Sequence, residues 1–258
     1  MRAMILAAGF GERLRPLTEA TPKPLLKVGN KPLIQYHIEN LAAAGVRELV
    51  INISWLGDQI EDFLGDGSHF GVEIAWSRER EPLETGGGIC RALPLLGREP
   101  FLLINGDVWT DYPLVELVNR VWSENIDAHL VLVPNPAHHL DGDYAFKAAQ
   151  GDIVVGGFGE KQGVSCPKLA YPTEGKQAFT FSGLSVMRPE IFAMYSSVGE
   201  KFPLRDVLKS SINTGTVSGE LFHGEWWDIG TLERLQALNT LLLENKTNAA
   251  NTIETGSS

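Results

Sequence analysis

The stretch MILAAGFGERLRPLTEATPKPLLKVGNKP, residues 4–32, joins an apolar run to a glycine loop and a group of cations. The apolar run predicts a first β-strand, and Gly9 and Gly11 directly after it allow backbone N–H groups to approach a phosphate or a base closely. Arg13 can hold phosphate oxygens with its planar guanidinium, whereas Lys23, between two prolines, presents a compact charge from a rigid backbone. The loop therefore indicates a polyphosphate ligand at the end of a strand.

The two glycines also invite comparison with the dinucleotide-binding fingerprint. That fingerprint needs a third glycine where this chain has Leu14, and an acidic residue at a set distance after a second strand, which is missing. The Walker lysine pattern is absent as well. An oxidoreductase that binds a nicotinamide dinucleotide is therefore a distant alternative.

Composition limits the classes of function. The chain has 258 residues, a formal net charge of -10 and a pI of about 5.1, which argues against nucleic acid or an anionic membrane as partners. Cys90 and Cys166 lie far apart in no metal-binding pattern, so a reducing cytoplasm is expected. His138 and His139, in a polar loop, are interpreted as surface residues. The polar segment 245–258 lacks periodicity and predicts a disordered tail.

Short apolar runs alternate with amphipathic segments through the first half of the chain, which predicts an α/β sheet of mostly parallel order. Predicted strands lie at residues 3–8, 46–53, 72–76, 101–105 and 128–134, and predicted helices at 32–45, 56–65 and 113–125. The run 86–88 predicts a glycine loop that enters a helix. Beyond residue 135 the pattern predicts an antiparallel hairpin over 143–158 with its turn at Gly151-Asp152, a strand at 178–187, and helices at 204–213 and 232–245.

The segment LAAGFGERLRPLTEATPKPLLKVGNKPLI closely resembles the signature LAAGxGxRLxPLTxxxPKPLxxVxxKPxI of the sugar-phosphate nucleotidyltransferases. Further segments resemble other motifs of that family, and the resemblance covers roughly the first 240 residues. These segments are EPLETGGGI, with Glu84 and Gly86 as departures, LLINGDV with Asp107, FGEKQG with Glu160 and Lys161, FSGLSVM, and GEWWDIGT with Asp228.

This resemblance implies a Rossmann-like three-layer sandwich with a mostly parallel mixed central sheet and a smaller antiparallel sugar-binding lobe. Residues 1–240 would form one domain, whose nucleotide-binding half is 1–135 and whose sugar-phosphate-binding half is 136–240. The implied reaction joins a nucleoside triphosphate to a sugar 1-phosphate and releases pyrophosphate. No C-terminal β-helix extension of the kind that some members carry is present in the sequence.

The resemblance also implies roles for particular residues. Arg13, Lys23 and Asp107 would be catalytic, and Asp107 and Asp228 would bind Mg²⁺, which prefers hard carboxylates together with phosphate oxygens and water. Nucleotide binding would use Ala8, Gly9, Gly11, Arg13, Lys23 and Gly87. Sugar-phosphate binding would use Asp107, Glu160, Lys161 and Arg205.

Taken whole, the chain is most similar to family members that use UTP and N-acetylmuramic acid 1-phosphate. The lactyl carboxylate of that sugar calls for a cation, for which Arg205 or Lys147 is a candidate. Enzymes that use mannose 1-phosphate with GTP or glucose 1-phosphate with dTTP remain alternatives, as does a non-catalytic regulatory subunit. We expect a cytoplasmic monomer or weak homodimer.

Overall fold

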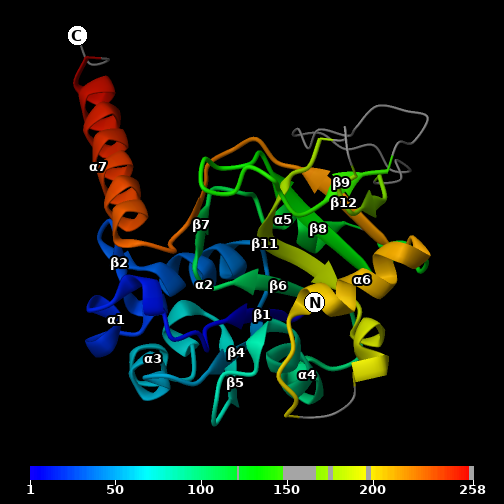
Figure 1. Ribbon diagram of the computed structural model, residues 1–258. Coiled ribbons are helices and arrows are strands. Elements are labelled where there is room, and N and C mark those ends of the chain that lie inside the picture. The colour runs from blue at the N-terminus through cyan, green and yellow to red at the C-terminus, as the bar shows by residue number, and fades with distance from the viewer. Residues whose placement is uncertain (121, 148–166, 174–176, 196–198, 256–258) are drawn as a thin grey trace.

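The computed structural model describes residues 1–120, 122–147, 167–173, 177–195 and 199–255. Seven strands form one sheet in the order β12-β8-β11-β6-β1-β4-β5, in which all strands run parallel except β11 (Figure 1). The predicted mostly parallel, mixed sheet is therefore confirmed. The strands are β1 (Ala3–Leu6), β4 (Glu48–Ile53), β5 (Glu73–Arg78), β6 (Phe101–Asn105), β8 (Ala128–Val133), β11 (Thr180–Met187) and β12 (Val217–Leu221).

Helices cover both faces of this sheet and complete three layers. Apolar side chains of α2 (Leu33–Ala43), α3 (Gly57–Leu64) and α5 (Val115–Asn119) pack on one face. The helices α4 (Glu84–Leu96) and α6 (Leu204–Thr214) and the 3₁₀ segment η4 (Pro189–Tyr195) pack on the other. Among the described residues, no helix is long and apolar enough to cross a membrane.

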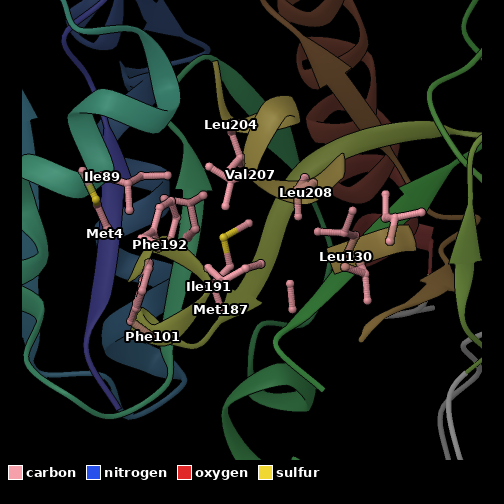
Figure 2. Close-up of a cluster of buried hydrophobic side chains, with 14 of the residues drawn as sticks. Met4, Ile89, Phe101, Leu130, Met187, Ile191, Phe192, Leu204, Val207 and Leu208 are labelled. Carbon is pink, nitrogen blue, oxygen red and sulfur yellow. The ribbon is translucent and has the colours of Figure 1, made fainter. Parts of the chain in front are cut away.

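The core beneath α4 and α6 shows why these apolar residues are spaced as they are. Figure 2 shows Ile89 of α4 beside Met4 of β1, and Val207 of α6 near Met187 of β11, all within one buried cluster. Successive side chains of a buried parallel strand are apolar on both faces, because helices cover both sides. The apolar runs at β1 and β6 follow from this arrangement.

Three small antiparallel pairs surround the main sheet. They are β2 (Lys27–Val28) with β3 (Lys31–Pro32), β7 (Val108–Thr110) with β13 (Trp226–Asp228), and β9 (Ala145–Phe146) with β10 (Leu169–Ala170). The predicted strand at 178–187 is β11, which lies inside the central sheet. The predicted hairpin turn at Gly151-Asp152 lies outside the described residues.

The helix predicted over 113–125 is wrong in length, because α5 ends at Asn119. Arg120 has extended backbone and directs its guanidinium to buried Glu220 of β12, with Nη2 2.6 Å from Oε2. The ring of Trp122 packs near the imidazole of His129 of β8, with centroids 5.0 Å apart. These contacts hold the segment against the sheet and end the helix.

A third apolar cluster joins the two ends of the chain. It consists of Leu14, Leu26, Val28, Leu33, Ile229, Leu235 and Leu238. Leu235 and Leu238 belong to α7 (Leu232–Thr255), which then extends away from the sheet (Figure 1). The backbone of α7 thus continues as helix into the segment predicted to be a disordered tail, because the helix satisfies its own backbone hydrogen bonds beyond the region where it packs.

Candidate active site

The glycine loop begins where β1 meets its two neighbours. Leu6, the last residue of β1, is in register with Asn52 of β4 and Asn105 of β6, so the chain leaves all three strands at one edge. Gly11 has a φ of 65° in front of the 3₁₀ segment η1 (Glu12–Leu14), a left-handed conformation that favours glycine. By contrast, a Cβ on Gly9 would meet nothing within 4 Å, so space is open on that side of the loop.

A buried polar network fixes the backbone on either side of this loop. The Asn52 Oδ1 atom accepts a 2.8 Å hydrogen bond from the backbone N–H of Ala7, and its Nδ2 donates to Glu79 Oε1 at 2.7 Å. The other oxygen of Glu79 accepts from the backbone N–H of Leu83 at 2.9 Å. The glycine loop and the start of α4 are therefore held by one carboxylate-amide pair, which sequence reasoning missed.

Lys23 and Asp107 meet at the end of β6, although 84 positions separate them in the sequence. Lys23 lies in the 3₁₀ segment η2 (Lys23–Leu25), and its Nζ donates to Asp107 Oδ2 at 2.7 Å. Burial acts to raise the pKa of the Asp107 carboxyl, but the ammonium of Lys23, with a smaller contribution from Arg13, holds that pKa below its usual value. The carboxylate is therefore ionised at neutral pH.

Asp228 lies beside Asp107 through strand pairing. In the β7–β13 pair Asp228 is in register with Val108, and the N–H of Ile229 donates to the carbonyl of Asp107 at 2.8 Å. The structure therefore brings these two carboxylate-bearing residues to neighbouring backbone positions at the same edge of the sheet.

Two side chains that sequence reasoning missed contact Asp228. Arg234, in the first turn of α7, places its Nη1 2.6 Å from Asp228 Oδ1 and 2.5 Å from Oδ2. His138, which was interpreted only as a surface residue, places Nε2 3.1 Å from Asp228 Oδ1. His138 is exposed, as interpreted from the sequence, and it reaches Asp228 because the loop after β8 folds over the β13–α7 connection.

Arg13 approaches the same place from the other end of the chain. A Cβ built on Gly230 would lie 3.2 Å from Arg13 Nη2 and 2.2 Å from Arg234 Nη2, so the two guanidiniums flank this glycine. The third apolar cluster explains this convergence, because Leu14 and Leu235 pack in it directly beside the two arginines. Among the residues with described contacts, Arg13 forms no ion pair.

The glycines 86–88 form part of helix α4, so their prediction as a loop is wrong. A Cβ on Gly86 would lie 2.4 Å from the ring of Phe202, and one on Gly87 would lie 2.2 Å from the carbonyl oxygen of Glu200. The N–H groups of Gly86 and Gly87 both donate to the Phe202 carbonyl, at 3.0 and 3.2 Å. Close packing between α4 and the segment before α6 therefore accounts for these glycines, and a base contact at Gly87 stays a prediction.

Glu84 occupies the position where the family signature has glycine. Its φ is 60°, a left-handed conformation that costs a residue with a side chain roughly 1–2 kcal/mol. Its Oε1 lies 4.0 Å from Lys201 Nζ, a distance at which two partly exposed side chains gain little. The departure from the signature is therefore accommodated with backbone strain at the start of α4.

The sugar-phosphate residues are placed only in part. Glu160 and Lys161 lie outside the described residues. Arg205 is the second residue of α6, which precedes the parallel strand β12 and so begins at the edge of the sheet that holds the strand ends. Lys147 lies at the opposite end of α6, since a Cβ on Gly215 would be 3.8 Å from its Nζ.

The donor set at Asp107 and Asp228 fits Mg²⁺. Both side chains offer hard carboxylate oxygens and both remain partly exposed. Within the described ranges, no group of three or more His, Cys, Asp or Glu residues could hold a metal alone. That absence is compatible with Mg²⁺, which usually takes one or two protein carboxylates and fills its other positions with phosphate and water.

An α/β sheet with a glycine loop, a cation-carboxylate pair and a second carboxylate at its strand ends defines a class of nucleotide-transferring enzymes. Residues 2–245 match the nucleotidyl transferase family, and the chain belongs to it. It is 46% identical over 244 residues to N-acetylmuramate alpha-1-phosphate uridylyltransferase of Neisseria meningitidis serogroup B, and the match covers 93% of this chain and 98% of that protein.

Two further comparisons extend this relation. A mannose-1-phosphate guanyltransferase of Yarrowia lipolytica is 41% identical over 134 residues, which cover 51% of this chain and 37% of that protein. The crystal structure of a putative glucose-1-phosphate thymidylyltransferase from Bacillus anthracis superposes with a TM-score of 0.77 at 20% identity, covering 93% of this chain and 95% of that one. The latter similarity supports the Rossmann-like fold.

Proposed function

We propose that the chain transfers UMP from UTP to N-acetylmuramic acid α-1-phosphate, giving UDP-N-acetylmuramic acid and pyrophosphate. The observation that carries this proposal is the 46% identity, over nearly the full length of both chains, to a uridylyltransferase that acts on N-acetylmuramate α-1-phosphate. Residues 1–135 would bind the nucleotide and residues 136–240 the sugar phosphate. Peptidoglycan recycling in the cytoplasm would be the setting.

The proposed reaction is a direct in-line displacement. An oxygen of the sugar 1-phosphate attacks the α-phosphorus of UTP, a new P–O bond forms, and the bond to the β-phosphate breaks so that pyrophosphate leaves with the electron pair. The attacking phosphate monoester is already ionised, so no general base is needed. Catalysis then depends on positioning and on stabilisation of charge.

Particular side chains supply these two contributions. Lys23 would neutralise charge that develops on the α-phosphate, and Arg13 would hold the β- and γ-phosphates of the leaving group. Asp107 and Asp228 would hold Mg²⁺, which when bound supplies further neutralisation of phosphate oxygens. The nucleotide would contact the backbone at Ala8 and Gly9, and also Gly11 and Gly87.

On the sugar side, Lys161 would grip the incoming phosphate and Glu160 would accept a hydrogen bond from a sugar hydroxyl. Arg205 is our candidate for the lactyl carboxylate, because its place at the start of α6 puts it at the edge of the sheet that carries the site. We expect Arg205→Ala to raise KM for this sugar phosphate and to leave KM for UTP unchanged. Unchanged steady-state kinetics would refute the assignment.

Pyrophosphate release with Mg²⁺ tests the proposed function. We would measure it for four nucleoside triphosphates against a panel of sugar 1-phosphates that includes N-acetylmuramic acid 1-phosphate. Asp107→Ala should abolish release, whereas the matched control Asp58→Ala, which removes an exposed carboxylate on α3, should retain it. Release confined to UTP and the muramic sugar supports the proposal.

The other outcomes of this assay each refute part of the proposal. Turnover of GTP with mannose 1-phosphate would favour the alternative suggested by the guanyltransferase match, which covers 51% of the chain. Turnover of dTTP with glucose 1-phosphate would favour a thymidylyltransferase. The absence of pyrophosphate release with every substrate pair would favour a regulatory subunit without catalysis. Sedimentation at micromolar concentration would test our proposal of a monomer or weak homodimer.

A further inference from the structure

Each carboxylate proposed to bind the metal already carries a side-chain cation. Lys23 Nζ lies 2.7 Å from Asp107 Oδ2, and Arg234 Nη1 lies 2.6 and 2.5 Å from the two oxygens of Asp228. The cationic side chains are 11% and 17% exposed, and their carboxylate partners 41% and 25%. The carboxylates are thus the more accessible members of both pairs.

The position of Arg234 suggests that its guanidinium can bind a second anionic partner besides Asp228. Its guanidinium flanks Gly230 together with that of Arg13, and of the two arginines Arg234 is the one with a carboxylate partner among the described contacts. Two cations held side by side repel each other unless an anion lies between or beside them. Phosphate oxygens suit such a pair, because the planar guanidinium binds them through two parallel hydrogen bonds.

We propose that Arg234 is an exchangeable counter-ion, which neutralises Asp228 in the free enzyme and turns to the polyphosphate beside Arg13 when Asp228 binds a divalent cation. This inference rests on the proposed function, because it takes its two ligands, a divalent cation and a nucleoside triphosphate, from that function. It goes beyond that function because it assigns to Arg234 a role in both ligand states.

Charge balance makes this exchange productive. In the free enzyme the two ion pairs are neutral, and of the three cations Lys23, Arg13 and Arg234 only Arg13 contributes uncompensated charge. Once both carboxylates serve a divalent cation, Lys23 and Arg234 are released, and all three side chains can face the phosphates. The divalent cation and the polyphosphate therefore bind cooperatively, each favouring the state that the other requires.

Binding of Mn²⁺ and pyrophosphate tests the exchange without turnover. Free Mn²⁺ would be followed by electron paramagnetic resonance, and pyrophosphate binding at saturating Mn²⁺ by calorimetry. In Arg234→Gln we expect Mn²⁺ to bind the free enzyme about fivefold more tightly, the factor expected when a competing, partly exposed ion pair is removed. Pyrophosphate should bind roughly tenfold or more weakly, because a charge-assisted contact is lost.

Two further variants make the result specific. Arg234→Lys keeps the charge and loses the planar guanidinium, so Mn²⁺ affinity should stay near wild type while pyrophosphate binding weakens. Arg78→Gln removes an arginine that pairs with Asp58 and Glu61 on the outer edge of the sheet, and should change neither affinity. The Arg234→Lys variant keeps the ion pair with Asp228, so its pyrophosphate affinity still tests the inference if Arg234→Gln fails to fold.

Opposite outcomes would overturn the inference. Weaker or unchanged Mn²⁺ binding in Arg234→Gln would show that Arg234 only orients Asp228 for the metal. Unchanged pyrophosphate binding in both variants would show that Arg234 does not reach the polyphosphate. Neither readout uses UTP or a sugar, so expected binding results together with turnover of a different substrate pair would keep this inference and refute the proposed substrates.

Discussion

Gly106 offers a test of how the glycine loop and Asp107 are held in position relative to each other. It connects β6 to Asp107, and its N–H donates to the carbonyl of Leu6 at the end of β1 at 2.9 Å. A Cβ at this position would lie 2.4 Å from that carbonyl oxygen, about 1 Å inside ordinary contact. Gly106→Ala must therefore separate the ends of β1 and β6, which carry the glycine loop and Asp107.

The cost of this separation can be estimated. Overpacking costs roughly 1–3 kcal/mol, and weakening of the buried hydrogen bond adds about 1 kcal/mol. We expect the free energy of unfolding to fall by about 2–4 kcal/mol, and Tm by roughly 5–15 °C for a chain of this size. Urea unfolding followed by tryptophan fluorescence would measure the loss, and pyrophosphate release would fall in parallel.

Gly9→Ala is the matched control, because it makes the same chemical change on the same edge of the sheet. A Cβ on Gly9 meets no protein atom within 4 Å, so the free energy of unfolding should stay within about 0.5 kcal/mol of wild type. Its KM for the nucleotide should rise, since the open space is where we place the ligand. Wild-type stability of Gly106→Ala would refute the proposed contact with β1, and wild-type kinetics of Gly9→Ala would refute the ligand's position.

Three further substitutions probe charge and contact. Lys23→Met should lower kcat by about 10²–10³-fold, as expected for one stabilising donor, with little change in the far-ultraviolet circular dichroism spectrum. Gly230→Ala would press only on the flexible ends of two arginines, so Tm should be retained while pyrophosphate binding by calorimetry weakens. Burial acts to raise the pKa of Glu220, but His129 and its other polar partners lower it to about 2. Because this folded-state pKa lies below its ordinary value, Glu220 stabilises the fold above that value and loses this contribution as pH falls toward about 2. Glu220→Gln should therefore destabilise by about 3 kcal/mol at pH 7 in urea titrations, with a gap from wild type that narrows below pH ~4.5.

Residues next to strand ends could be placed from the sequence. Asp107 follows the apolar run of β6, and Asp228 ends the short strand β13. The shared role in Mg²⁺ binding that the resemblance implies predicts that the two carboxylates lie close together. The pairing of β7 with β13 realises that expectation at the backbone, because it sets Asp228 opposite Val108. The apolar run of β6 places Asp107 at the carboxyl edge of the parallel sheet, whereas β13 lies outside that sheet and brings Asp228 there by antiparallel pairing with β7.

Contacts made by long side chains between distant segments could not be placed in this way. His138 and Arg234 are separated by 96 positions, and neither follows a period or motif that indicates their approach to Asp228. The prediction of a loop at glycines 86–88 was wrong for the same reason, because it took no account of contacts with distant segments. A run of glycines predicts a loop by local propensity, whereas here each glycine is required by a segment that packs against α4 from elsewhere in the chain.

Packing in the third apolar cluster fixes the early turns of α7 beside the candidate site. Leu14 and Leu235 are buried in the same small core, and each is the chain neighbour of an arginine that flanks Gly230. A side chain as long as arginine reaches a fixed point only when its Cα is held, and packing of the neighbouring leucine holds it. The early turns of α7 therefore set the position of Arg234 relative to Arg13, so the N-terminal glycine loop and the start of the C-terminal helix are held together as one structural unit.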